Sequence, residues 1–181
     1  MKLSVLICTI PSRMTMGLIP EVCRQATKDV EVLWLGDNKS MSIGEKRNRL
    51  LSIATGDYVI FADDDDRVSS DFIQSLLAGI DKGCDVVVFK QVCSINGARG
   101  KEVFFDIRNK NKNFPDHYER QPHHGMCIKR DIASQVPYLD INYGEDSDFG
   151  ERINGLLKSQ AKINKVLYYY DYNQKTSEAK P

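Results

Sequence analysis

Cysteine is scarce in this sequence, and its arrangement excludes most cysteine-based sites. The five cysteines are odd in number and widely spaced, and none forms a Cys-x-x-Cys pair. We therefore expect no zinc ribbon, no dithiol redox centre and no disulfide framework of the kind found in secreted domains. Three of them lie in apolar runs, where cysteine behaves as a small core residue. This usage predicts a reducing, cytoplasmic environment.

Long apolar runs and net charge are missing as well. No stretch approaches the ~20 residues that span a bilayer. The apolar stretch at 3–8 is shorter than a signal-peptide core, so we expect no integral membrane segment. The 25 Lys and Arg residues balance the 25 Asp and Glu residues, which gives a formal net charge of 0. Neutrality argues against a protein drawn as a whole to a polyanion, although a local basic patch is compatible with it.

The sequence does have a regular alternation of short apolar runs and helix-length segments. Strands are expected at 3–10, 30–35, 58–62 and 85–92, and helices at 14–26, 44–54 and 70–80. Such alternation predicts an α/β fold whose mostly parallel sheet is flanked by helices. Ligands bind sheets of this kind at the carboxyl ends of the strands.

The rhythm changes after residue 97. We expect a strand at 101–107, a polar and basic loop at 108–113, helices near 131–135 and 145–158, and a closing strand at 163–170. No low-complexity linker or internal repeat interrupts the chain. We therefore expect a single domain over residues 1–172, followed by a polar tail at 173–181.

The most informative stretch is an acidic run at the end of the third expected strand. Asp63, Asp64, Asp65 and Asp66 follow directly on the apolar residues 58–62. Clustered carboxylates repel each other, and a hard divalent cation relieves that repulsion. The alternative is a solvated acidic turn in which Asp66 caps the next helix.

Further motifs accompany this run in a fixed order along the chain. They are Ser4–Arg13, Val32–Asp37, Ser42–Asn48, Ala54–Tyr58, Tyr143–Phe149 and Lys165–Tyr170. Together with the acidic run they resemble family-2 glycosyltransferases with the GT-A fold, over residues 3–172. The resemblance implies a Rossmann-like sheet that binds a nucleotide at the carboxyl ends of its strands.

By resemblance, the acidic residues divide into metal, donor and acceptor ligands. Asp65 corresponds to the principal ligand of Mn²⁺ or Mg²⁺, Asp63 lies near the ribose or the metal, and Asp64 lies beside the nucleoside and the donor sugar. Asp146 matches the family's general base, and Glu145 beside it helps to bind the acceptor. This assignment implies single displacement with inversion at the anomeric carbon. The alternative for Glu145 and Asp146 is that they only complement the dipole of the helix that they open.

The resemblance also assigns the nucleotide contacts. Thr9 and Pro11 shape the loop under the base. The charged residues expected at the phosphates or the base are Arg13, Lys46, Arg47 and Asp37. For Lys46 a plain surface charge is the alternative. A UDP-sugar is the first donor to expect, although no residue selects uridine over guanosine, cytidine or thymidine.

Two further segments have open roles. His123 and His124 precede the expected catalytic helix, so either one is expected at the donor sugar or the acceptor, or serves only in the structure. Neighbours on a strand face opposite sides, so we expect no two-histidine metal site. The basic loop at 108–113 is a lid, an acceptor contact or a solvated loop.

The function that this pattern predicts is an inverting, metal-dependent transfer of a sugar from a nucleoside-diphosphate sugar to an acceptor hydroxyl. One alternative is a non-catalytic nucleotide-sugar-binding module. Another is a nucleotidyltransferase, but the chain lacks a glycine-rich, lysine-containing pyrophosphate loop near its start. A glycan or glycolipid is the first acceptor to expect, with a protein or a modified nucleic acid left open.

Overall fold

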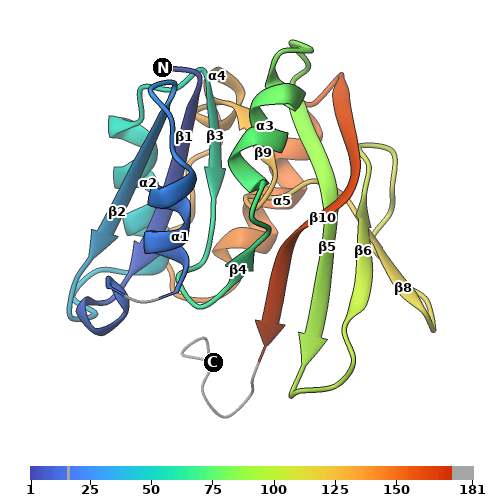
Figure 1. The fold of residues 1–181 in the computed structure, drawn as a ribbon, viewed down its shortest axis with the longest axis horizontal. Helices are drawn as coiled ribbons and strands as arrows, with labels where there is room; N and C mark the ends of the chain where they lie inside the picture. The colour runs from blue at the N-terminus through green and yellow to red at the C-terminus, as the bar shows by residue number, and fades with distance from the viewer. Residues whose placement is uncertain (16, 173–181) are drawn as a thin grey trace.

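The computed structural model describes residues 1–15 and 17–172, and within them one mixed sheet of ten strands runs between two layers of helices (Figure 1). Helices α1 (Leu18–Gln25) and α3 (Phe72–Ile80) cover one face, and α2 (Ile43–Ile53), α4 (Arg130–Ala133) and α5 (Glu145–Asn154) lie on the other. The predicted α/β architecture is confirmed. The predicted tail at 173–181 lies outside the described residues.

The N-terminal half forms the parallel part of the sheet. Strand β1 (Leu3–Thr9) pairs in parallel with β2 (Val30–Gly36) on one edge and with β3 (Tyr58–Phe61) on the other. The helix expected at 14–26 begins only at Leu18, because a 3₁₀ turn (Pro11–Arg13) follows β1 and Gly17 has a positive φ of 69°. That turn places one charged side chain, that of Arg13, after the end of β1 instead of along a helix.

A short antiparallel strand separates β3 from the next long strand. Strand β9 (Cys127–Lys129) pairs antiparallel with β3 on one side and with the start of β5 (Val86–Ile95) on the other. The chain therefore returns from its C-terminal half into the centre of the sheet. The sheet is mostly parallel in paired length, and its antiparallel pairings are short.

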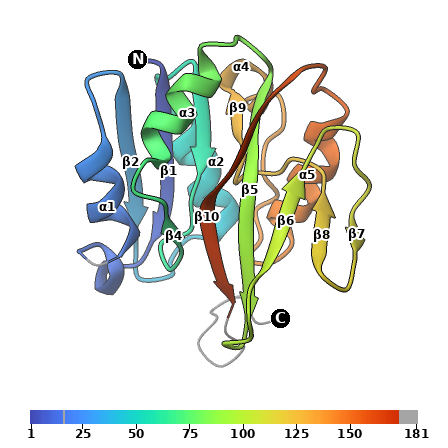
Figure 2. The ribbon, with the colours of Figure 1, turned by 45° about the vertical axis from the view of Figure 1, so that its right-hand side comes forward.

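The closing strand β10 (Gln160–Tyr172) crosses its neighbour. It runs parallel to β5 along its whole length, with register shifts between Ile163 and Val166 and between Val166 and Tyr168, and Figure 2 shows it passing across β5. Its second half then pairs with β4 (Arg67–Val68), which directly follows the acidic run. The crossing brings tyrosines from the end of the chain to the end of β3.

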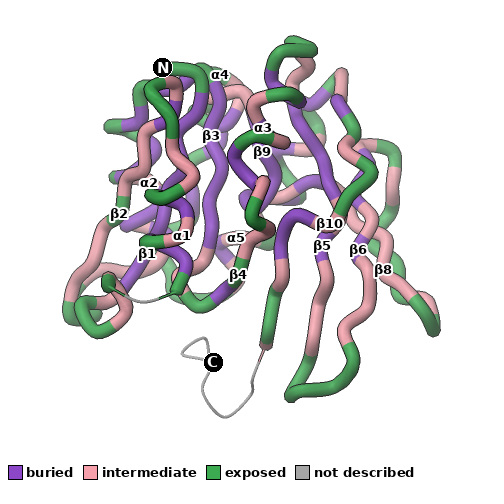
Figure 3. The backbone as a smooth tube through the Cα atoms, in the orientation of Figure 1, coloured by how far each residue is buried: buried purple, intermediate pink, exposed green. Residues whose placement is uncertain are grey.

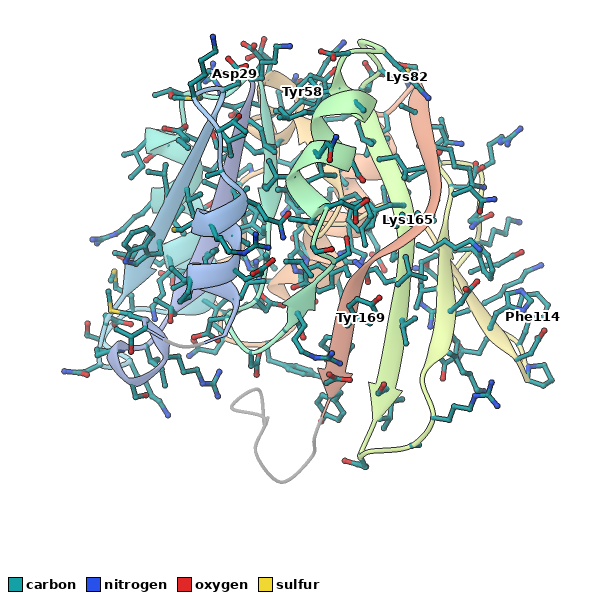
Figure 4. All side chains as sticks on the ribbon, in the orientation of Figure 1. Asp29, Tyr58, Lys82, Phe114, Lys165 and Tyr169 are labelled. Atoms are coloured by element: carbon teal, nitrogen blue, oxygen red, sulfur yellow. The ribbon has the colours of Figure 1, made fainter. Side chains whose placement is uncertain are left out.

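The remaining strands extend the sheet beyond β5. Strand β6 (Lys101–Phe105) pairs antiparallel with β5, and β8 (His117–Arg120) adds to β6 in parallel. The loop expected at 108–113 is partly a strand, because β7 (Lys112–Asn113) pairs with β8 to form a hairpin. Phe114, labelled in Figure 4 at the outer end of this hairpin, stacks on His117 with ring centroids 4.5 Å apart.

The core lies where the sheet is covered on both faces. Figure 3 shows mostly buried residues along β1, β3, β9 and the first half of β5. The side chains of Val86, Val87, Val88 and Phe89 are at most 2% exposed, which accounts for a run without alternation. The second half of β5 leaves this core and lines a cavity described below.

Helix α2 contacts the segment before α5 so closely that only glycine fits at one position. A Cβ on Gly44 would lie 1.7 Å from the backbone oxygen of Leu139, and the Gly44 N–H donates to Ile141 O at 3.1 Å. Asn48 of the same helix exchanges two hydrogen bonds with the Tyr138 backbone, at 2.9 and 2.8 Å. These contacts fix the entry to α5 against α2.

Gly44→Ala is therefore expected to destabilise the protein by roughly 1–3 kcal/mol, even though alanine is the better helix former. Urea unfolding measures the change. Gly155→Ala is the matched control, because a Cβ there meets its nearest atom at an ordinary 3.6 Å. Equal unfolding free energies for the two variants would contradict the close contact at Gly44.

Candidate active site

The acidic run that follows β3 is divided between different partners. Asp63 receives a hydrogen bond from Arg47 Nη2 at 3.1 Å, and its second oxygen lies 3.7 Å from His124 Nε2. Burial opposes the charged form of Asp63, but Arg47 and His124 outweigh it and hold its pKa below the ordinary value. Asp63 is therefore a charged carboxylate at neutral pH.

Arg47 is the central cation of this network. Its Nε donates to Glu145 Oε1 at 3.3 Å, so one guanidinium joins the end of β3 to the first residue of α5. The side chain is 4% exposed, and its guanidinium lies 5.2 Å from the Phe61 ring centroid and 5.7 Å from that of Tyr138. This geometry holds three elements together at the site.

Asp64 and Asp65 face a different cation. Asp64 accepts hydrogen bonds from Thr9 Oγ1 at 2.7 Å and from Arg13 Nη1 at 2.9 Å. The same Arg13 nitrogen lies 3.4 Å from Asp65 Oδ2, and the Asp65 side chain is 55% exposed. Burial and the neighbouring Asp63 and Asp64 raise the pKa of Asp65, although Arg13 opposes them. Among Asp63, Asp64 and Asp65, the most exposed side chain is that of Asp65.

Asp66 is not a helix cap. The residues after it form β4, and α3 begins only at Phe72, with Asp71 at its N-cap. Asp66 is 3% exposed and is hydrogen-bonded to Tyr168. Burial, reinforced by the charge of Asp63, raises its pKa to about 8. Tyr168 also accepts a hydrogen bond from the Asp63 N–H at 2.9 Å, so β10 supports both ends of the run.

Helix α5 has three acidic residues in its first turn, Glu145, Asp146 and Asp148. Glu145 is buried against Arg47, whereas Asp146 is partly exposed and accepts a hydrogen bond from the Ser147 N–H at 2.8 Å. Burial opposes the charged form of Asp146, but His124 and Arg47 lower its pKa below the ordinary value. Asp146 is thus ionised and able to accept a proton. Asp148 instead receives a hydrogen bond from Arg152 Nε at 2.9 Å.

Lys46 and Asp37 form a buried ion pair beside the end of β1. Lys46 also donates to Thr9 O at 3.2 Å. Because Lys46 is only 4% exposed, it is not a plain surface charge. Asp37 accepts hydrogen bonds from the Ser40 and Met41 N–H groups, and Lys46 holds the pKa of Asp37 below its ordinary value. In this arrangement Asp37 fixes the loop that leads into α2.

The two histidines lie in a loop, so strand alternation does not separate them. Their ring centroids are 4.9 Å apart, and His123 also packs edge-on against Phe105 at 5.1 Å. Burial, with a further contribution from His124, lowers the pKa of His123 to about 3. His123 is therefore a neutral ring, and its Nδ1 accepts the Gly125 N–H at 3.1 Å.

Two cavities meet between the acidic run and α5. The larger cavity, of about 730 Å³, lies between the end of β1, the first turn of α2, the acidic run and residues 142–147. The smaller cavity, of about 600 Å³, lies between β5, β6, the β7–β8 hairpin, the two histidines and α5. Asp63, Asp66 and Asp146 line both.

The structure brings most of the predicted site residues to these cavities. The larger cavity is lined by Thr9, Arg13, Lys46, Arg47, Asp63, Asp64, Asp65, Glu145 and Asp146, and the smaller one by Asp63, His123, His124 and Asp146. Pro11 and Asp37 do not line either of the two cavities. Their predicted roles at the base stay predictions.

Sequence reasoning missed the contribution of β10 and of β8, whereas an acceptor contact was among the roles left open for residues 108–113. Tyr168 and Tyr170 line the smaller cavity, and Asn113 and Arg120 reach it from the hairpin. A signal for the tyrosines was present, because residues two apart on a strand share a face. Tyr169 faces the other way, and Arg67 lies 5.2 Å over its ring (Figure 4).

The carboxylates suit a hard divalent cation that a ligand helps to hold. In the described part of the chain, no group of three or more His, Cys, Asp or Glu side chains is arranged to hold a metal ion by itself. Asp63, Asp65 and Asp66 nevertheless line one cavity, and Asp66 Oδ2 is buried with no hydrogen-bond partner among the described residues. Mg²⁺ characteristically binds one or two carboxylates and completes its shell with water and phosphate oxygens. The donor set fits such an ion.

Comparison with known families decides the relationship. The sequence model described as Glycosyl transferase family 2 matches residues 18–134, which is more than half of the chain. The chain belongs to glycosyl transferase family 2. The family membership that the motifs predicted is therefore confirmed, while the roles of individual residues remain proposals.

The fold of this family-2 chain is similar to that of solved S. aureus structures. It matches TarS 1–349 in complex with UDP with a TM-score of 0.73 at 18% identity, covering 94% of this chain and 60% of that one. It matches TarS 1–349 in complex with UDP-GlcNAc with a TM-score of 0.69 at 16% identity, covering 99% and 62%. The predicted GT-A fold is confirmed, and the chain spans about 60% of the TarS 1–349 chain.

Two further observations concern this family-2 chain. None of the curated proteins matches its sequence. Within residues 1–15 and 17–172, none of the helices is both long and apolar enough to cross a membrane.

Proposed function

We propose that the protein is an inverting, metal-dependent glycosyltransferase that moves a sugar from a nucleoside-diphosphate sugar to an acceptor hydroxyl. The observation that carries this proposal is that Asp63, Asp66 and Asp146 line both cavities. A donor in one cavity and an acceptor in the other meet at these carboxylates. Membership of glycosyl transferase family 2 supports the reaction class.

The larger cavity is the proposed donor site. Arg13 and Lys46 supply positive charge to the nucleotide, and Thr9 orients Asp64 at its edge. Asp65, with Asp63, is proposed to hold Mn²⁺ or Mg²⁺. Such an ion, when bound, neutralises the leaving diphosphate as a Lewis acid. The carboxylates repel a diphosphate, so the metal is expected to strengthen nucleotide binding.

Asp146 is the proposed general base. Its ionised carboxylate lies at the junction of the cavities, where it accepts the proton of the acceptor hydroxyl as the oxygen attacks the anomeric carbon. The bond to the diphosphate breaks on the opposite face of that carbon, so the configuration inverts. Glu145, held by Arg47, keeps the first turn of α5 in place for this step.

UDP is the proposed nucleotide and a glycan or glycolipid the proposed acceptor. The structural neighbours were solved with UDP and with UDP-GlcNAc, which makes these the first compounds to try.

Carboxamides and aromatic rings line the smaller cavity, namely Gln91, Asn111, Asn113, Gln121, Asn154, Phe105, Tyr118 and Tyr170. Such groups hydrogen-bond hydroxyls and cover the apolar faces of sugar rings, which suits a saccharide.

A thermal-shift panel of UDP, GDP, CDP and TDP, each with and without Mn²⁺, tests the donor site. At about 100 times its dissociation constant, the correct diphosphate with Mn²⁺ adds about 2.7 kcal/mol, a rise of roughly 5–10 °C in Tm. Asp65→Asn is expected to remove the Mn²⁺-dependent part of this rise. Asp57→Asn, at the opposite end of β3, is the matched control and keeps it. A panel in which every nucleotide leaves Tm unchanged would count against the donor site.

A further inference from the structure

Arg13 lies beside two carboxylates of the acidic run, where a bound metal ion would also be attracted. It belongs to the 3₁₀ turn after β1, and its Nη1 lies 2.9 Å from Asp64 Oδ1 and 3.4 Å from Asp65 Oδ2. All three side chains line the larger cavity, and the Arg13 side chain is 31% exposed. One guanidinium therefore bridges two consecutive carboxylates at the edge of the cavity.

The partners of the acidic run make this bridge informative. The buried Arg47 lies between Asp63 and Glu145 and offsets the negative charge of Asp63. Asp64 uses one oxygen for Thr9 and the other for Arg13. Asp65 has a longer contact with the same Arg13 nitrogen, and its side chain is the more exposed of the two. The cation nearest to Asp65 is thus one that the protein itself supplies from the cavity wall.

We infer that Arg13 is an internal counter-cation of the donor site, which opposes the binding of a divalent metal ion alone and favours the binding of a nucleoside diphosphate alone. The inference rests on the proposed function, since it takes the larger cavity as the donor site. A positive charge beside Asp65 repels a second cation. The same charge attracts a diphosphate that would otherwise meet uncompensated carboxylates.

The two ligands should therefore respond to loss of Arg13 in opposite directions. Arg13→Ala is expected to tighten Mn²⁺ binding about three- to tenfold and to weaken UDP binding in EDTA by a similar factor. A merely structural role cannot produce this result, because a loosened site weakens both ligands. Arg13→Lys keeps the charge and is expected to bind both ligands within about twofold of the wild type.

Isothermal titration of the full chain with Mn²⁺ alone, and separately with UDP alone in EDTA, measures both changes. Arg24→Ala is the matched control, because Arg24 pairs with Glu21 on α1 in solvent and does not line either cavity. Its two affinities should equal those of the wild type. A thermal melt of each variant verifies that it is folded.

The outcomes separate the inference from the proposed function. If the wild type binds UDP with Mn²⁺ but Arg13→Ala leaves Mn²⁺ affinity unchanged or lowers it, the inference is wrong and the proposed function stands. If the wild type binds no nucleotide with or without Mn²⁺, the donor site itself is wrong, and the inference falls with it. Opposite shifts in Arg13→Ala, with none in Arg24→Ala, support both.

Discussion

Asp146→Asn is expected to lower the rate of UDP release from a UDP-sugar by about 10²–10⁴-fold, the usual contribution of a positioned general base. The substitution keeps the size of the side chain and its hydrogen bond from the Ser147 N–H, but it removes the group that takes up the proton. UDP affinity should stay within about twofold of the wild type, since the acidic run and Arg13 are untouched. Release of UDP from UDP-GlcNAc, followed with and without an added saccharide, measures the rate.

Asp148→Asn is the matched control for this experiment. Asp148 lies two residues further along the same first turn and carries the same charge, but it binds Arg152 and lines neither cavity. Its rate should remain close to that of the wild type. If both variants turned over equally fast, the base would have to be sought elsewhere. If both slowed equally, the loss would reflect the dipole of the helix and not proton transfer.

Arg47→Met is expected to lower the free energy of unfolding by about 3–5 kcal/mol. Methionine fills much of the same volume, so the loss comes from the charges that remain. Without the guanidinium, the buried Glu145 and the partly exposed Asp63 both lose their shared partner. Denaturation in urea, monitored by circular dichroism, gives the change.

Two companion variants isolate the electrostatic cause. Arg49→Met, on the exposed face of α2, removes a solvent-facing pair with Glu45 and should change stability by no more than about 0.5 kcal/mol. Adding Glu145→Gln to Arg47→Met should recover part of the loss, because it removes one uncompensated charge. Full stability of Arg47→Met alone would show that the buried network does not hold the site together.

The sequence is informative about the fold wherever burial imposes a pattern. The alternation of apolar runs and helical segments predicts β1, β2, β3 and β5 with the helices between them, and the pattern is clearest in β1, β3 and the first half of β5, whose residues are almost all buried. It is silent on β9, since three residues are too few to show a period. It is equally silent on the crossing of β10, which depends on register shifts and on contacts with β4 that no local pattern encodes.

The site could be predicted as a set of residues but not as a network. The order of the motifs was enough to select the carboxylates of the acidic run and of α5. Which of these carboxylates is buried, paired or exposed is set by side chains that arrive from distant segments. Asp66 illustrates the limit: a local interpretation makes it a helix cap, whereas Tyr168, a hundred residues later, decides its surroundings.

The two cavities draw most of their walls from different stretches of the chain. Residues 8–66 and 142–147 supply much of the larger one, while the second half of β5, the hairpin and the later turns of α5 supply the smaller one. Variation in the hairpin can therefore alter what enters the smaller cavity without disturbing the carboxylates at the junction. Under the proposed function, a lineage or a designer can change the molecule that receives the sugar independently of the molecule that supplies it.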